Sequence, residues 1–559
     1  VFSNTKLGTW GSKKVSVSAF RMIGTTNWNN PSEMARSGRI YTMEAEGKTV
    51  QAIGIENDKI VFIGSNADAE KLSAVNRIDL QGRTVLPGFN EGHMHLASYG
   101  HIYHHVTLFH CRSVEECLEE IRLYRTAHPK AAYVFARGWN EDYFTDRCYP
   151  TRQELDEVCP DVPVELVRVC GHMSVCNSCA IEKIDQLPQA AAFRDVDQIV
   201  DGFLYENAIE LFDAILSEPT LEEVEEMLLY AMRDLNRCGI TTCQTDDFGA
   251  IAGAGWDRII EAYKDLESRG LMTVRVYEQC LFTQQRLFEE FLAAGHRTGQ
   301  GGDFFKIGPL KLLQDGSLGA KTALLSKPYK DSSDYGIAIF TQDELDSMIG
   351  LAHKSGMQIA VHCIGDGAMN MVLDSLEKAQ RLWPRSDCRH GIVHVQLSTR
   401  EILERMAAND VIAYIQPVFV DYDMGMVPQR VAGPFEDIYA WKTMEDLGIL
   451  TVGGSDAPVE SFDVLNNLYY AVTREHLAGG PAGGWLLEQK VSAYQAVSMF
   501  TTHGAQACFQ ESVIGRLLPD MKADLVVLSD DPMLAEPYDI PKINVQATMV
   551  NGRFVYFES

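Results

Sequence analysis

The chain has 559 residues, more than one hydrophobic core usually organises, so we expect a large domain with accessory parts. Its composition, 46% hydrophobic and 23% charged, is ordinary for a globular protein. The formal net charge of -28 argues against nucleic-acid and anionic-membrane partners, because such a surface repels phosphate groups. The 13 cysteines are odd in number and scattered, which disfavours a disulfide scaffold and favours a cytoplasmic location.

The beginning of the chain has no pattern of a targeting segment. The stretch from Val1 to Phe20 is polar and mixed, without the basic patch and apolar core of a signal peptide. No window of the sequence is apolar over the length that a membrane span requires. Residues 1–35 are interpreted only as an extra strand or a disordered leader.

Two β-rich segments lie near the ends of the chain. Residues 36–86 contain alternating apolar runs, with Asn57-Asp58 between two of them as a hairpin turn. Residues 506–559 show the same pattern of alternating apolar runs, with Asn551-Gly552 as the hairpin turn between two of them. We therefore expect the two ends to pair into one small β-sandwich domain, with the long middle of the chain inserted between its two parts.

The middle of the chain, residues 87–505, alternates helices with near-continuous apolar strands. Thr220 and Thr341 each begin a helix as the first residue of a capping box, and Ser398 is a plain cap for a third helix. This alternation predicts a parallel sheet covered on both faces. Polar residues follow strand after strand, and no G-x-G-x-x-G follows the first strand, so we favour a (β/α)8 TIM barrel over an open doubly wound sheet. Residues 131–217 interrupt the rhythm and are expected to form an insertion or lid over the mouth of the barrel.

The segment TVLPGFNEGHMHL holds the first candidate site. Residues two positions apart in a strand face the same side, so His93 and His95 present two imidazoles to one point. Three further metal-capable residues, His362, His394 and Asp456, each stand at the end of an apolar run. Imidazole and carboxylate ligands suit zinc-like ions. Each residue alone also fits an ordinary core position, but the five together predict a metal centre at the carboxyl ends of barrel strands.

The ordered set of motifs resembles the amidohydrolase superfamily. LPGFNEGHMH is similar to its opening motif, and DGSLGAKTA, HCIGDGA, HVQ, IQP and GSDAP resemble the YtcJ-like branch, which includes N-substituted formamide deformylases. The resemblance extends over almost the whole chain. It implies that His93 and His95 bind a buried metal ion and that His362 and His394 bind a second one. It also implies that Asp456 binds the first ion and acts as general acid and base.

Lys311 occupies the position at which related enzymes carry a carboxylated lysine that bridges two metal ions. Adjacent cations favour the neutral amine of a lysine, which can take up carbon dioxide and become an anionic ligand. The resemblance therefore implies two zinc ions bridged by carboxylated Lys311. The alternative is an ordinary lysine paired with Asp315, in which case a single ion is expected.

The predicted insertion contributes candidate substrate-binding residues. GHMSVCNSCA resembles a family stretch that contains the histidine, so His172 is expected to polarise the substrate carbonyl. The alternative is a structural zinc on His172, Cys176 and Cys179. Trp139 is expected either to line the same pocket or to be a buried aromatic of the insertion. Gln416, in the motif IQP, is a further candidate to face the pocket.

The expected reaction is hydrolysis of a non-peptide, amide-like C–N bond in a small molecule. A metal ion lowers the pKa of its bound water to about 7, which supplies hydroxide at neutral pH. Asp456 would orient that hydroxide and pass its proton to the leaving nitrogen. Two alternatives stay open: a mononuclear deaminase of a ring amidine, favoured by an unmodified Lys311, and a non-catalytic scaffold, disfavoured by the complete ligand set. The resemblance also suggests a homodimer.

Overall fold

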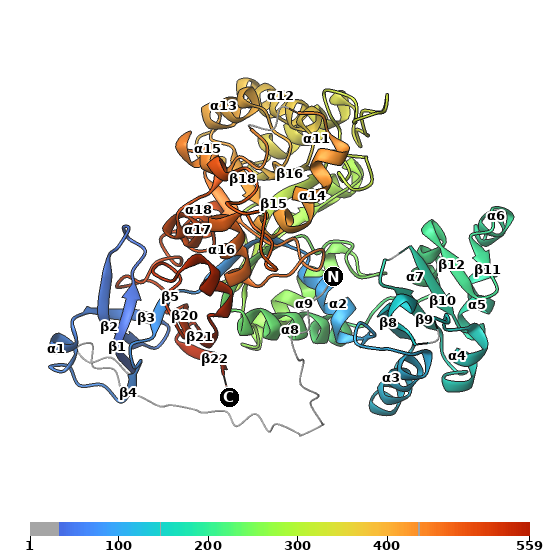
Figure 1. Cartoon of the computed structure of the whole chain (residues 1–559), viewed down its shortest axis with the longest axis horizontal. Helices are drawn as coiled ribbons and strands as arrows, with labels where there is room; N and C mark the ends of the chain where they lie inside the picture. Colours follow the sequence, from blue (N-terminus) through green and yellow to red (C-terminus); the bar gives the residue numbers. More distant parts are fainter. Residues whose placement is uncertain (1–32, 146, 171, 434–436, 559) are drawn as a thin grey trace.

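Figure 1 shows the chain as a computed structural model, which describes residues 33–145, 147–170, 172–433 and 437–558. The expectation that Val1–Phe20 carries no signal peptide lies outside these residues, as does most of the unassigned leader. None of the described helices is long and apolar enough to cross a membrane. Three β-sheets organise the described residues, and each is taken in turn below.

The central sheet is a parallel barrel, as the alternation of helices and strands predicts. Its strands are, in spatial and chain order, β6 (Phe89–Met94), β13 (Ile240–Thr245), β14 (Arg275–Leu281), β15 (Phe305–Leu313), β16 (Ile359–Cys363), β17 (Gly391–His394), β18 (Ile412–Ile415) and β19 (Thr451–Gly453). The first and last strands approach closely, because a Cβ on Gly92 would lie 2.5 Å from the side chain of Val452. The Asp456 amide also donates to the His93 carbonyl oxygen at 2.8 Å. These contacts close the barrel and bring the ends of β6 and β19 together.

Helices alternate with these strands along the chain. They are α8 (Leu221–Arg237), α9 (Trp256–Ser268), α10 (Gln285–Ala293), α11 (Gln342–Lys354), α12 (Asp366–Leu382), α13 (Arg400–Ala408), α14 (Val420–Arg430), α15 (Trp441–Asp446), α16 (Val464–Thr473), α17 (Ala493–Met499) and α18 (Thr502–Ala507). Thr220 and Thr341 form the predicted capping boxes of α8 and α11. The predicted cap Ser398 is wrong by one residue, because Thr399 accepts the hydrogen bond from the Ile402 amide at the start of α13. The Ser398 hydroxyl donates instead to a backbone carbonyl in the loop before α15.

Both ends of the chain meet in one eight-stranded sheet, which confirms the expected pairing of the two β-rich segments. Its strands are β1 (Glu33–Tyr41), β2 (Thr49–Glu56), β3 (Lys59–Gly64), β4 (Asn76–Asp79), β5 (Thr84–Pro87), β20 (Leu525–Leu528), β21 (Val545–Val550) and β22 (Arg553–Phe557), with α1 (Asn66–Ala69) after β3. Antiparallel pairing of β5 with β20 joins the two parts. The predicted hairpin turns are present, with positive φ angles of 57° at Asn57 and 52° at Asn551.

A six-stranded sheet lies between the first and second barrel strands along the chain. It consists of β7 (Val106–Thr107), β8 (Val134–Trp139), β9 (Val164–Arg168), β10 (Met173–Cys176), β11 (Ile199–Val200) and β12 (Phe203–Tyr205). The helix α2 (Leu96–His104) comes before this sheet and packs on α8 of the barrel. The helices of the six-stranded unit are α3 (Val114–Ala127), α4 (Arg152–Val158), α5 (Ser178–Ile184), α6 (Ala190–Asp195) and α7 (Glu210–Ala214).

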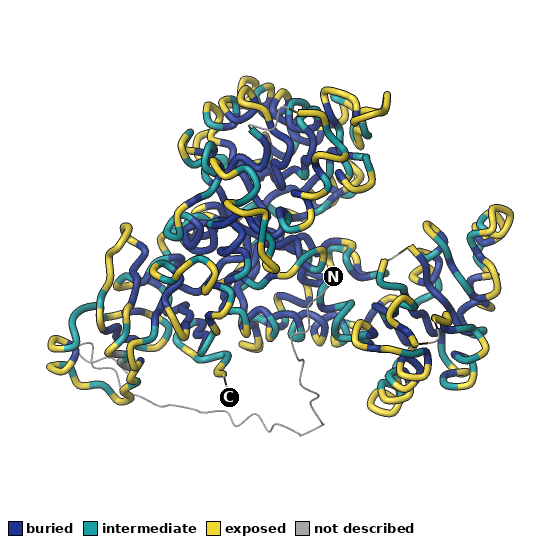
Figure 2. Tube along the Cα trace, in the orientation of Figure 1, coloured by how far each residue is buried: buried dark blue, intermediate teal, exposed yellow. Residues whose placement is uncertain are grey.

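This six-stranded unit has buried cores of its own and projects to one side of the barrel. Figure 2 shows the buried residues concentrated in the barrel and, separately, in the projecting unit. Its strand β7 and helix α3 precede residue 131, so the sheet begins before the range expected for the insertion. The limits of the domains and the action of this unit as a lid stay predictions.

A buried ion pair fastens the barrel to the sheet of the chain ends. Arg275, the first residue of β14, donates from Nε to Asp524 at 2.6 Å, and both side chains are buried. We expect Asp524→Asn to lower the free energy of unfolding by about 3–5 kcal/mol, because the guanidinium would stay buried without its countercharge. Chemical denaturation measures the change. Asp530→Asn, on an exposed position, is the control and should stay within about 0.5 kcal/mol; an equally small change for Asp524→Asn would contradict the role of the pair.

Candidate metal centre

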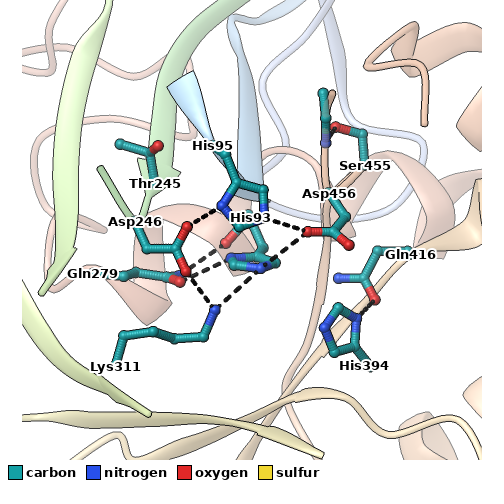
Figure 3. A network of polar contacts seen from close by, with 12 residues as sticks. His93, His95, Thr245, Asp246, Gln279, Lys311, His394, Gln416, Ser455 and Asp456 are labelled. Atoms are coloured by element: carbon teal, nitrogen blue, oxygen red, sulfur yellow. Dashed lines mark hydrogen bonds and ion pairs between the residues drawn. The ribbon is translucent and has the colours of Figure 1, made fainter. Parts of the chain in front are cut away.

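Every strand of the barrel places a polar side chain either within its last three residues or within the three residues that follow its carboxyl end. In strand order these residues are His93, Asp246, Gln279, Lys311, His362, His394, Gln416 and Asp456. The carboxyl ends of parallel barrel strands share one rim, so eight segments far apart in the chain converge there. Figure 3 shows most of these side chains directed toward a common centre. Together with His95, two positions after His93, these side chains include all six residues predicted as metal ligands, which the structure brings together.

His93, His95 and Asp246 form the tightest part of the centre. One potential ligand atom from each lies within 4.8 Å of the other two. Asp456 Oδ1 lies 2.9 Å from His95 Nε2 and 3.3 Å from His93 Nε2, while Asp246 contacts Nδ1 of His95. His93 and both carboxylates are buried. The arrangement directs imidazole nitrogens and carboxylate oxygens to one small volume.

Amide side chains fix the tautomers of two of the histidines. Gln279 Oε1 lies 2.9 Å from Nδ1 of His93, and Gln416 Oε1 lies 2.8 Å from Nδ1 of His394. An amide oxygen only accepts, so each Nδ1 carries the proton and each Nε2 keeps a lone pair. The ring of His362 lies 4.4 Å from that of His394, and its Nε2 faces a backbone carbonyl oxygen at 3.2 Å, which leaves its Nδ1 lone pair available.

Burial keeps three of the four histidines neutral. It is the main cause that lowers the pKa of His93, and Lys311 lowers it further. The same two causes lower the pKa of His362 to about 4. Burial and the neighbouring His362 hold the pKa of His394 well below its ordinary value. Neutral imidazole is the form of histidine that binds metal ions.

Both carboxylates stay ionised although they are buried. Burial would raise the pKa of Asp246, but the charges of His95 and Lys311 outweigh it and lower the pKa. At Asp456 burial is likewise outweighed, here by hydrogen bonds with His93 and His95, and the pKa lies well below its ordinary value. Burial would lower the pKa of His95, yet Asp246 and Asp456 raise it well above the ordinary value. A divalent ion arriving between these carboxylates would displace the proton of His95, so the two ionised carboxylates and the four imidazoles are a donor set that fits a divalent metal ion.

Lys311 lies inside this centre and not beside Asp315. Its Nζ is 2.7 Å from Asp246 Oδ2 and 3.3 Å from His93 Nε2. Asp315 instead accepts hydrogen bonds from three backbone amides, and burial raises its pKa to about 7. The alternative pairing of Lys311 with Asp315 is therefore wrong. The partner of the lysine is Asp246.

Asp246 and Gln279 are the residues of the centre that sequence reasoning missed. Asp246 stands near the end of the apolar run ITTCQTDD. The same signal, a metal-capable residue at the end of an apolar run, identified Asp456 and could have identified Asp246. The adjacent Asp247 shares that signal but accepts hydrogen bonds from Tyr263 and a backbone amide, and nothing local distinguishes the two aspartates. Gln279 lies within a strand and has no local signal.

The candidate substrate-binding residues of the expected insertion belong to the six-stranded unit, which projects away from the barrel (Figure 1). The side chain of His172 is 70% exposed, and its Nδ1 lies 2.9 Å from Glu206. Trp139 is buried, and its indole N–H donates to a backbone carbonyl at 2.9 Å. His172, Cys176 and Cys179 are not one of the three-ligand groups that the described residues form, so the structural zinc gains no support. The roles of His172 and Trp139 toward a substrate stay predictions.

Gln279→Leu tests whether the amide orients the metal-binding nitrogen of His93. We expect the affinity for the metal ion to fall about 10–100-fold, because the ring loses the partner that fixes its tautomer. Competition with a chromophoric chelator measures the affinity. Gln429→Leu, at an exposed position, should leave the affinity unchanged. Equal affinities in Gln279→Leu and wild type would show that the amide does not orient the ring.

Comparison with known proteins gives matches over nearly the whole chain. A family model described as "Amidohydrolase family" matches residues 77–556. The YtcJ protein of Bacillus subtilis (strain 168) is 29% identical over 544 residues, which are 93% of this chain and 99% of that protein. N-substituted formamide deformylase of Arthrobacter pascens is 23% identical over 568 residues, 94% of this chain and 98% of that protein. The crystal structure of an uncharacterized metal-dependent hydrolase from Pyrococcus furiosus aligns with a TM-score of 0.75 at 26% identity, covering 90% of this chain and 99% of that chain.

Proposed function

Since the chain is a metal-dependent hydrolase of the amidohydrolase family, in its YtcJ-like branch, we propose that it cleaves a non-peptide, amide-like C–N bond of a small molecule. The observation that carries the proposal is the convergence of donors from all eight barrel strands on one rim. The Arthrobacter pascens relative is named for the deformylation of N-substituted formamides, so such compounds are the first substrates to test.

We assign the metal ligands as follows. His93, His95 and Asp456 would hold one divalent ion, and His362 and His394 would hold a second. Zinc suits these donors, and Lys311 would bridge the two ions when its amine carries a carboxyl group. When bound, the ions supply water activated at neutral pH and positive charge beside the substrate carbonyl. With an unmodified Lys311 a single ion is expected.

Asp456 is placed to move the proton of the reaction. Its carboxylate is ionised, buried and held by His93 and His95, so it can accept a proton from the attacking water and orient that water. The oxygen of the water joins the carbonyl carbon as the C–N bond breaks. Asp456 then returns the proton to the leaving nitrogen. Water is consumed, and the products are a carboxylate compound and an amine.

Gln416 is the predicted substrate-binding residue for which the contacts give most support. Its Oε1 accepts from His394, whereas its Nε2 is buried and has no hydrogen-bond partner among the described residues. A buried N–H donor without a hydrogen-bond partner costs free energy, and an oxygen of the substrate would supply the missing acceptor. We therefore keep Gln416 as a donor to the substrate carbonyl or to a neighbouring oxygen.

A substrate screen with metal analysis tests the proposed function. The compounds are N-formyl and N-acyl amines, cyclic amides and ring amidines, assayed with the metal-loaded chain. Release of an amine from an amide substrate is the expected result. Release of ammonia from a ring amidine alone, with one ion bound, would replace the proposal by the deaminase. A chain with no bound metal after metal-replete growth and no turnover would instead indicate a scaffold. The cytoplasmic location and the homodimer stay predictions.

A further inference from the structure

A second group of metal-capable side chains lies at the opposite end of the barrel. His353 is in the last turn of α11, shortly before β16, and Cys388 and His390 directly precede β17. One potential ligand atom from each lies within 4.8 Å of the other two. These residues stand at the amino ends of barrel strands, whereas the candidate metal centre lies at the carboxyl ends. The group is therefore separate from the candidate metal centre.

His353 is held as metal-binding histidines usually are. Its ring is buried, and its Nε2 lies 2.7 Å from the carbonyl oxygen of Trp383, so Nε2 carries the proton. The lone pair is then on Nδ1, which faces Nε2 of His390 at 2.9 Å. A backbone carbonyl on the far nitrogen is a common outer partner of a metal-bound imidazole. Burial lowers the pKa of His353 and of His390, so both rings are neutral.

His390 cannot satisfy both of its nitrogens in either tautomer. Its ring is buried, and its Nδ1 has no hydrogen-bond partner within the described residues. If Nε2 carries the proton, it donates to His353 and leaves a bare lone pair at Nδ1. If Nδ1 carries the proton, that N–H has no acceptor and two lone pairs face each other across 2.9 Å. A cation bound between the two rings would remove the repulsion between the facing lone pairs of the second tautomer, because each lone pair would then bind the ion.

Cys388 brings a sulfur donor to the same place. Its side chain is half-buried, and its Sγ lies 3.6 Å from the carbonyl oxygen of Arg385. Burial raises the pKa of the thiol, so an arriving ion has to displace its proton, which leaves to solvent. The two basic neighbours are already engaged. Arg385 donates to backbone carbonyls, including that of His353, and Arg389 pairs with two carboxylates.

A cavity gives solvent access to the group. It has a volume of about 410 Å³ and is lined by Cys388 and His390 together with residues of α12, α13 and the loop before β19. It has room for an entering ion and for water as a further ligand. Structural zinc sites use cysteine and histidine in a four-coordinate arrangement.

We propose that His353, Cys388 and His390 bind a thiophilic divalent cation of the zinc class, with water from the cavity as the fourth ligand. The ion takes one nitrogen from each imidazole and the thiolate sulfur, and the thiol proton is released. Binding ties the end of α11 to the segment that enters β17. Because this link lies at the amino face of a TIM barrel, we expect it to stabilise the fold and not to take part in turnover.

Cobalt substitution of the full chain tests this site. Metal-free protein is titrated with Co²⁺ to saturation while its near-ultraviolet absorption is recorded. We expect a thiolate-to-cobalt charge-transfer band, because the donors assigned to the candidate metal centre are nitrogen and oxygen. Cys388→Ser should lose the band and bind one ion fewer per chain. Cys238→Ser, at another half-buried cysteine, is the matched control and should keep both the band and the ion.

Two results would overturn the proposal: a saturated wild-type chain without the band, or a band that persists in Cys388→Ser. Circular dichroism shows whether Cys388→Ser folds. If it does not fold, His390→Gln takes its place and should weaken the cobalt binding that gives the band by about ten-fold or more. An unchanged affinity in that variant would equally overturn the site.

Discussion

Asp456→Asn is expected to lower kcat/KM by about 10²–10⁴-fold while the chain stays folded. An amide cannot take the proton from the attacking water, and it removes one negative charge from the metal-binding donor set. The backbone tolerates the change, because Asp456 has a φ of 63° and asparagine adopts this left-handed region as readily as aspartate. Steady-state kinetics on a hydrolysed amide measures the loss, and circular dichroism checks the fold.

Asp410→Asn is the matched control for this experiment. Asp410 also has a left-handed backbone, with a φ of 51°, but it is exposed and stands before the amino end of β18, at the opposite end of that strand from the rim. Full activity is expected in this variant. Full activity in Asp456→Asn would instead remove Asp456 from the mechanism.

Lys311→Met should have the second large effect. The thioether side chain fills similar volume but cannot take up carbon dioxide, so the bridging ligand is lost. We expect one metal ion fewer per chain and a fall in kcat/KM of about 10²-fold or more. Elemental analysis and kinetics measure the two effects. A variant that keeps both ions and full activity would show that the lysine is no bridge.

Two further experiments test whether the effect of Lys311→Met comes from loss of the carboxylated amine. The first is a control variant of another lysine, and the second detects the carbamate directly. Lys306→Met changes a lysine on the same strand, β15, whose Nζ donates to a backbone carbonyl, and should keep all ions and activity. Carbon-13 bicarbonate supplied during metal loading should give a carbamate signal in the wild type. Lys311→Met should lack that signal. A wild-type chain without it would favour the single-ion centre.

Local sequence patterns predicted most of the fold. The capping boxes at Thr220 and Thr341, the two Asn-containing hairpin turns and the apolar strands each depend on neighbours within a few positions. The candidate ligands were found in the same way, as polar residues at strand ends. Such signals are local, so a single sequence contains them. They also explain the error at Ser398, where two adjacent hydroxyl residues compete for one cap.

Pairings across the barrel could not be predicted from local patterns. Asp246 and Lys311 are 65 positions apart, and the pairing of β13 and β15 with the strand β14 between them brings their side chains to 2.7 Å. Only the structure therefore identifies Asp246, in place of the expected alternative Asp315, as the partner of the lysine. Gln279 lies inside a strand, and its contact with His93 depends on which face of β14 points to the rim. His172 matches a motif, but the packing of a separate sheet decides where it lies.

Metal content followed together with turnover during chelation tests the central claim most directly. We expect that the purified chain contains divalent metal, that a chelator removes metal and activity in parallel, and that adding back the ion restores both. His93→Ala, processed in the same way, should have a lower metal content and no turnover. Turnover that survives complete removal of the metal would contradict the account.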